Sequence, residues 1–176
     1  LNPRLGIVGG ISILGTRGTV IPFSNEAYCD TIRVSMDVTR AEGGFCIALS
    51  TGGKSERFLR RTRPDLPETA FIQVADFFSF SIRCAVEKDF SHILYSCFFG
   101  KLVKMAQGHE NTHDKRSRID FYTLSRLCAS YGMDKQRVVQ IKGANTAREA
   151  LQKIVEAPRG MEVIRQITKD ALVNAR

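Results

Sequence analysis

The chain has 176 residues, 43% of them hydrophobic and 25% charged, which is close to the average for globular proteins. This composition excludes intrinsic disorder, a collagen-like fibre and a small disulfide scaffold, and no apolar run approaches the ~20 residues that a membrane span needs. The net charge is +8, from 26 Lys and Arg against 18 Asp and Glu. A positive surface attracts phosphates, nucleic acid, anionic lipid or a polycarboxylate, and charge alone does not choose among these ligands.

The cysteines predict a cytoplasmic protein. There are five of them, an odd number, and no pair has the spacing of a metal-binding C-x-x-C. No basic region precedes a hydrophobic one at the start of the chain, as it would in a secretory signal. We therefore expect reduced thiols at all five positions: Cys29, Cys46, Cys84, Cys97 and Cys128.

The first half of the chain predicts a parallel sheet. Residues 1–23 form a glycine-rich entry segment of short extended pieces and turns, and Ser24 or Asn25 then caps a helix that runs to about Ala41. Three nearly continuous apolar runs follow, with helical patterns at 54–61 and 78–88 between them. The runs, at 45–49, 71–75 and 93–99, predict strands covered on both faces, within a βαβαβ core at about 45–99.

The rest of the chain, about 100–175, predicts helices. They are expected at 100–107, 119–131, 147–156 and 160–174, and Thr146 and Glu149 form a capping box before the third. The chain as a whole is therefore predicted to be a single α/β domain. It has three layers, with helices on both faces of a mostly parallel sheet, followed by a helical C-terminal region.

Three loops lie where a parallel sheet binds ligands, beyond the carboxyl ends of its strands, and the third of them is residues 100–114. The turn Thr51-Gly52-Gly53 opens a helix, and its backbone N–H groups can hold an anion or a ligand hydroxyl. It resembles a P-loop, but Ala48 stands where the first glycine is required, and a plain βα turn is the alternative. Asp76 follows the second run and predicts either a contact with ribose hydroxyls or a helix cap.

A zinc-protease pattern is present at His109-Glu110-x-x-His113, where a helix would place both imidazoles on one face. Its extended form would need a glycine and a histidine where Arg116 and Ile119 stand. A zinc metallopeptidase is therefore an alternative function. A basic nucleic-acid-binding module is another, although the basic runs 57–63 and 115–118 lack interleaved aromatic side chains.

Two segments of the chain have distinctive patterns. The first is 2–16, Asn-Pro-Arg-Leu-Gly-Ile-Val-Gly-Gly-Ile-Ser-Ile-Leu-Gly-Thr, and the second is Gly-Lys-Leu-Val-Lys at 100–104 with Gly108 and Thr112-His113. Together they resemble the CbiD family of cobalt-precorrin-5B C1-methyltransferases. The resemblance implies methyl transfer from S-adenosylmethionine to C1 of a cobalt-containing tetrapyrrole in anaerobic cobalamin biosynthesis. Cobalt enters only as part of this substrate. Because family chains are longer, we expect this chain to be a fragment that lacks an N-terminal domain.

The resemblance also implies partners and site residues. The partner is a polycarboxylate tetrapyrrole, with no nucleic acid and no membrane; homo-oligomer formation stays open. His113 is the candidate catalytic residue, which accepts a proton or steadies charge on the macrocycle, and no metal ligand is expected. Cofactor binding is assigned to Thr51, Gly52, Gly53 and Asp76, and substrate binding to Gly10, Ser12, Thr16, Lys101, Lys104, Asn111 and Thr112. Asp76 and Asp114 differ from the residues common in the family, Asn and Ser.

Overall fold

A computed structural model describes Gly9 and residues 24–175 of the chain. Contacts divide the chain into two compact units, Leu1–Ser96 and Cys97–Arg176, where the sequence predicts a single α/β domain. Each unit has its own hydrophobic core. Gly10, Ser12 and Thr16, which the family resemblance assigns to the substrate, lie outside the described residues.

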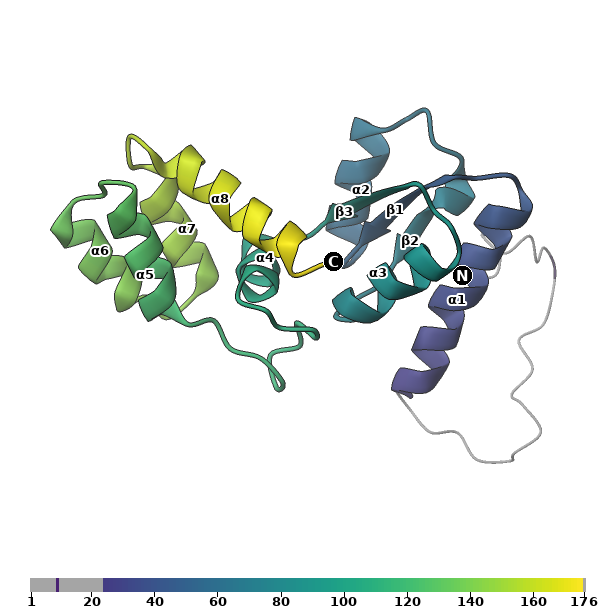
Figure 1. The fold of residues 1–176 in the computed structure, drawn as a ribbon, viewed down its shortest axis with the longest axis horizontal. Helices are drawn as coiled ribbons and strands as arrows, with labels where there is room; N and C mark the ends of the chain where they lie inside the picture. Colours follow the sequence, from purple (N-terminus) through teal and green to yellow (C-terminus); the bar gives the residue numbers. More distant parts are fainter. Residues whose placement is uncertain (1–8, 10–23, 176) are drawn as a thin grey trace. The chain divides into compact units, whose positions relative to one another are not determined.

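The first unit contains a sheet of three parallel strands (Figure 1). These are β1 (Cys46–Ser50), β2 (Phe71–Gln73) and β3 (His92–Ser96), in the spatial order β2-β1-β3. Ala48 of β1 lies opposite both Phe71 and Leu94. The strand order changes direction after β2, and the two crossovers therefore place their helices on opposite faces.

The core confirms the three-layer α/β fold. Helices α1 (Asn25–Ala41) and α3 (Phe78–Glu87) pack on one face, where Ile47 and Leu49 point into the larger core cluster. Helix α2 (Gly53–Thr62) covers the other face, where Ala48 packs. A short 3-10 helix, Glu68–Ala70, leads into β2. This alternation along β1 is what a strand with two covered faces requires.

Local signals fix the bounds of α1. The Ser24 hydroxyl accepts a hydrogen bond from the Ala27 amide at 3.2 Å, which confirms the predicted N-cap. After the helix, Gly43 adopts a φ of +79°, a left-handed conformation that favours glycine. The chain then turns into β1.

The second unit is helical. Its elements are α4 (Phe99–Ala106), α5 (Phe121–Ser130), α6 (Lys135–Lys142), α7 (Ala147–Val155) and α8 (Gly160–Val173). The predicted cap before α7 is present, since the Glu149 amide donates to the Thr146 hydroxyl at 3.2 Å. Within the described residues, no helix is long and apolar enough to cross a membrane.

A close approach of backbones joins α7 and α8. A Cβ built on Gly160 would lie only 1.7 Å from the Ile154 carbonyl oxygen. Real atoms do not approach so closely, and this junction therefore requires glycine at position 160. The turn between the two helices runs through Pro158, in the gap between the predicted helices at 147–156 and 160–174.

Two predictions about this part of the chain were wrong. The third strand ends at Ser96 rather than at 99, and Phe98 is the N-cap residue of α4 and 60% exposed. The helix α6 was not predicted. Ile141 is the only one of its residues that is fully buried, and its apolar periodicity is correspondingly weak.

Candidate functional site

The expected cofactor residues lie at one edge of the sheet in the first unit. The Val74 amide donates to the Ser50 carbonyl at 2.8 Å, which holds the carboxyl ends of β1 and β2 side by side. The strand-end turn, residues 51–53, leaves the first strand at this edge, and Asp76 follows the second. The structure therefore brings these four expected residues to the position where parallel sheets bind ligands.

The strand-end turn leaves room above its backbone. The Ser55 hydroxyl donates to the Gly52 carbonyl at 2.8 Å and lies 3.4 Å from the Thr51 hydroxyl, so the turn is tied to the first turn of α2. Gly52 has an extended φ of 160°, which any residue can adopt. A Cβ built there meets nothing within 4 Å, and the backbone is consequently open to a ligand.

The turn after β2 contains a strained residue. Ala75 has a φ of 48°, a left-handed conformation that costs a residue with a side chain about 1 to 2 kcal/mol. This conformation sets the direction of Asp76, the next residue. The N-cap position of α3 is Phe77 rather than Asp76, and the Phe77 side chain makes no capping hydrogen bond.

Two aromatic residues at the same edge were not predicted as site residues. Tyr28 of α1 and Phe77 stack with ring centroids 5.5 Å apart, and the Tyr28 hydroxyl donates to the Gln73 carbonyl at 3.4 Å. Burial raises the pKa of Tyr28, and the negative charge of Asp76 raises it further. Tyr28 is distant from the strand-end loops in sequence, and only the packing of α1 against the sheet brings it here.

A buried polar network lies beside the strand-end turn. Glu56 of α2, only 4% exposed, accepts hydrogen bonds from Gln73 at 2.7 Å and from Arg60 at 2.9 Å. The Ser50 hydroxyl is fully buried and has no partner among the described residues. The network ties α2 to β2 and so fixes the first turn of the helix that begins at Gly53.

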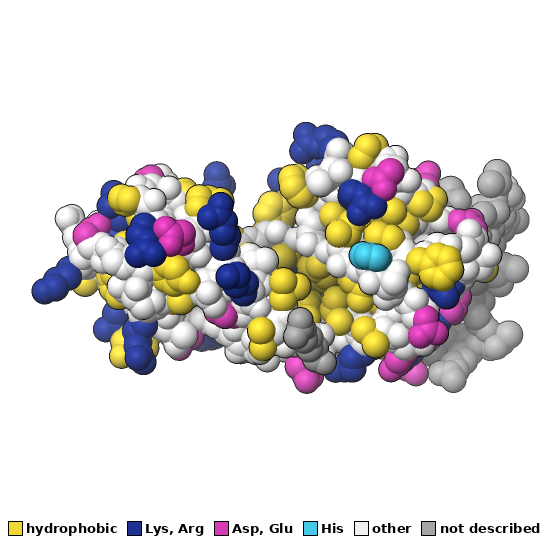
Figure 2. Space-filling view, turned by 45° about the horizontal axis from the view of Figure 1, so that its top comes forward, with side chains coloured by type: hydrophobic (Ala, Val, Ile, Leu, Met, Phe, Trp, Pro, Cys, Tyr) yellow, Lys and Arg dark blue, Asp and Glu magenta, His cyan; other side chains and the backbone are white. Residues whose placement is uncertain are grey.

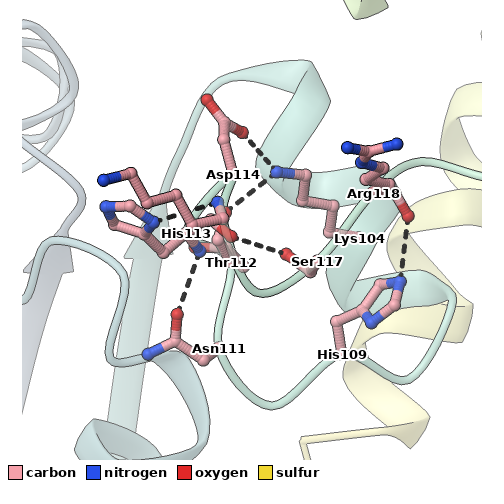
Figure 3. A network of polar contacts seen from close by, with 9 residues as sticks. Lys104, His109, Asn111, Thr112, His113, Asp114, Ser117 and Arg118 are labelled. Carbon is pink, nitrogen blue, oxygen red and sulfur yellow. Dashed lines mark hydrogen bonds and ion pairs between the residues drawn. The ribbon is translucent and has the colours of Figure 1, made fainter.

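The expected substrate residues of the second unit lie on α4 or in the α4–α5 loop, residues 107–120, and Figure 3 shows Lys104, Asn111 and Thr112 among them. Lys104 of α4 is 5% exposed, and its ammonium donates to the Thr112 carbonyl at 3.0 Å and to the Asp114 carboxylate at 2.5 Å. It is therefore not an ordinary solvated lysine. The direct contact with substrate that was expected of Lys104 stays a prediction, and the observed geometry gives this residue a positioning role in the loop.

His113 is held by its own loop. Its amide donates to the Asn111 side-chain oxygen at 3.0 Å, and its carbonyl accepts from the Ser117 hydroxyl at 3.3 Å. Its ring nitrogen Nδ1 accepts from the Lys115 amide at 3.1 Å. The imidazole is exposed but fixed in direction (Figure 3).

Electrostatics show that Lys104, His113 and Lys101 all lie near the Asp114 carboxylate. The pKa of Asp114 is lowered, chiefly by its hydrogen bond to Lys104 and the charge of that lysine, with smaller contributions from His113 and Lys101. All three groups therefore act on one exposed carboxylate. Lys101, Lys104, Asn111, Thr112 and His113 thus form one cluster at the α4–α5 loop.

The zinc-protease pattern lacks the geometry it needs. Helix α4 ends at Ala106, and residues 109–113 are not helical. The His109 ring nitrogen Nε2 lies 3.1 Å from the Arg118 carbonyl and donates to it. Among residues 24–175, no three His, Cys, Asp or Glu side chains are grouped as metal ligands, and the peptidase alternative has no support in this geometry.

Most of the net positive charge belongs to the second unit. Residues 97–176 contain 15 of the 26 Lys and Arg but only 8 of the 18 Asp and Glu, and so carry +7 of the net +8. Figure 2 shows Lys and Arg side chains spread over the helices of this unit on the face in view. On this face they are not gathered into one patch, which gives the nucleic-acid alternative no particular support.

A small pocket of about 230 Å³ opens between the α5–α6 turn and the α7–α8 junction. Its two arginines are already paired, Arg137 with Asp134 and Arg159 with Glu162. The pocket therefore offers no uncompensated charge to a ligand.

Comparison with known proteins identifies the class. Residues 111–176 match the family model described as CbiD, C-terminal domain, and residues 1–22 match the one described as CbiD. Together these matches cover half of the chain. The chain belongs to the CbiD family, as the sequence resemblance predicted.

Several curated relatives are named cobalt-precorrin-5B C(1)-methyltransferase. The one from Nitratidesulfovibrio vulgaris is 52% identical over 151 residues, which are 86% of this chain and 39% of that protein. The relative from Priestia megaterium is 42% identical over 149 residues, 85% of this chain and 41% of that protein. The chain thus spans about two fifths of the length of these relatives. No solved structure matches it significantly.

Proposed function

We propose that this chain is part of a cobalt-precorrin-5B C1-methyltransferase, which transfers a methyl group from S-adenosylmethionine to C1 of a cobalt-containing tetrapyrrole. The observation that carries this proposal is the identity of 40 to 52% with relatives that bear this name, over most of the chain. The fold agrees with it, because a parallel α/β sheet with an open strand-end turn is a common frame for binding nucleoside cofactors.

The donor fits the carboxyl edge of the sheet in the first unit. The open backbone at Gly52 and Gly53 would receive the amino acid part of S-adenosylmethionine, whose carboxylate can accept from amides at the start of α2. Asp76 would accept hydrogen bonds from the ribose hydroxyls. Tyr28 and Phe77 supply an apolar, stacked wall at the same edge, which suits a purine.

The substrate fits the second unit. A cobalt-precorrin carries acetate and propionate side chains, and a unit with a net charge of +7 attracts such a polyanion. Within the α4–α5 loop cluster, Lys101 is partly exposed and His113 is exposed, and these two side chains would meet substrate carboxylates. Lys104 would act indirectly, by holding the Thr112 carbonyl in place.

The reaction needs no covalent enzyme intermediate. The nucleophilic carbon C1 attacks the sulfonium methyl, so a C–CH3 bond forms while the S–CH3 bond breaks and the sulfur leaves as a neutral thioether. The protein must hold carbon and methyl in line at about 3 to 3.5 Å and exclude water.

Binding of S-adenosylhomocysteine, measured by isothermal titration calorimetry, tests the donor site. Gly52→Val is informative because the backbone suits valine and its side chain enters open space, so that the fold is retained while ligand approach is blocked. We expect Gly52→Val and Asp76→Ala each to weaken binding at least about tenfold, as loss of about 1.4 kcal/mol implies. Asp65→Ala, an exposed carboxylate ahead of β2, is the control. Unchanged affinity in both site variants would refute the assignment.

A further inference from the structure

The hydrogen bond on the His113 ring fixes which nitrogen carries the proton. The Lys115 amide is a donor, so Nδ1 must offer its lone pair at this 3.1 Å contact. A neutral imidazole has one protonated nitrogen, and the proton therefore belongs on Nε2. This nitrogen has no partner among the described residues, and Figure 3 shows it directed away from the loop.

The loop also fixes the orientation of the imidazole. The Lys115 N–H holds the ring through Nδ1. The backbone on both sides of the ring is fixed as well, by Asn111 at the His113 amide and by Lys104 at the Thr112 carbonyl. The side chain is thus a preorganised donor on a loop whose own contacts hold it in place.

We propose that His113 binds a carboxylate of the tetrapyrrole through Nε2–H and acts as a hydrogen-bond donor rather than as a proton acceptor. The proposal deepens the proposed function and rests on it. Of the two roles expected for His113, accepting a proton or steadying charge, it selects the second. Lys101, which also acts on the Asp114 carboxylate, supplies a positive charge in the same cluster and favours an anionic ligand group there.

Nitrogen NMR tests the tautomer directly. The chain has only three histidines, so the His113 ring signals can be assigned by their loss in a His113→Gln variant. Above pH 8 we expect the pattern of a neutral ring with the proton on Nε2. A proton on Nδ1 would overturn the proposal, because Nε2 would then be an acceptor.

Substitutions separate a donor from a base. The amide nitrogen of glutamine can take the place of Nε2–H but cannot accept a proton, whereas asparagine is too short and matches Nδ1 instead. The probe is uroporphyrin, an octacarboxylate tetrapyrrole, titrated by fluorescence against the chain. We expect His113→Gln to bind within about threefold of the unaltered chain, and His113→Asn and His113→Ala to bind about five- to tenfold more weakly. His92→Gln, at an exposed position in the first unit, should bind unchanged.

The possible results separate the donor role of His113 from the proposed function of the chain. Equal loss in His113→Gln and His113→Ala, with the unaltered chain still binding uroporphyrin, would overturn the donor role and leave the proposed function standing. If the unaltered chain fails to bind uroporphyrin, or binds its octamethyl ester equally well, the carboxylate ligand class is refuted and the substrate side of the proposed function falls with it. Retained binding in His113→Gln together with loss in the shorter variants supports the donor.

Discussion

Replacing Lys104 by methionine tests whether a buried ammonium organises the α4–α5 loop. Methionine keeps most of the buried apolar stem but removes all three N–H donors. Two contacts are lost, to the Thr112 carbonyl at 3.0 Å and to the Asp114 carboxylate at 2.5 Å. The loop would then be attached to α4 without its central polar contact.

The two contacts differ in what their loss costs. Thr112 is 1% exposed, and taking a donor from a buried carbonyl costs about 1 to 3 kcal/mol. The Asp114 side chain is 97% exposed and is rehydrated when the lysine is gone, so its loss adds little. The carbonyl therefore decides the result, and the expected destabilisation of the loop is about 1 to 3 kcal/mol.

Amide hydrogen exchange measures this local opening without requiring global unfolding. The free energy above predicts that protected amides of 112–118 exchange about 5- to 150-fold faster in Lys104→Met. Lys115→Met makes the same change of charge at an exposed position of the same loop and should leave exchange nearly unaltered. Equal exchange in Lys104→Met and the unaltered chain would refute the positioning role.

Two further predictions concern the same unit. Gly160→Ala should lower the free energy of unfolding in urea by about 3 kcal/mol or more, because its Cβ would lie 1.7 Å from the Ile154 carbonyl, whereas Gly143→Ala meets its nearest atom at 3.5 Å and should cost much less. Asp114 has a lowered pKa, so its stabilising contact with Lys104 is present above the ordinary value of 3.8 and is lost as the pH falls through the lower folded value. Carboxyl carbon NMR should show protonation of Asp114 below pH 3.8, and in Lys104→Met the midpoint should return toward 3.8; an unchanged midpoint would contradict the assignment.

The sheet could be predicted because its signal is local. Each strand is a short apolar run, and a strand with two covered faces needs no partner pattern to be recognised. The same rule predicted a third strand that extends too far, because Cys97, Phe98 and Phe99 are also apolar. The structure places Phe98 outside any strand and leaves it 60% exposed. An apolar run shows where burial is available, but not where the chain leaves the sheet.

Helix α6 shows the opposite case. Its N-cap is clear in the structure, since the Asp134 carboxylate accepts a hydrogen bond from the Arg137 amide at 2.9 Å. In the sequence, an Asp three residues before an Arg does not by itself indicate a helix N-cap. Only Ile141 of this helix is fully buried. Sequence periodicity detects a helix through its buried face, and a short helix that buries one side chain gives almost no signal.

The lysines of α4 show why the site was only partly predictable. Their spacing of three residues correctly places Lys101 and Lys104 on neighbouring parts of one helix surface, but spacing cannot show what covers that surface. The loop that follows α4 covers Lys104, and the Lys104 ammonium holds this loop in place through its hydrogen bond to the Thr112 carbonyl. The burial of Lys104 is thus a product of contacts with Thr112 and Asp114, eight and ten residues away, that form only when the loop folds back. The role of a lysine in such a loop follows from these contacts rather than from its place in a motif, and so Lys101 and Lys104, alike in sequence, are assigned different tasks.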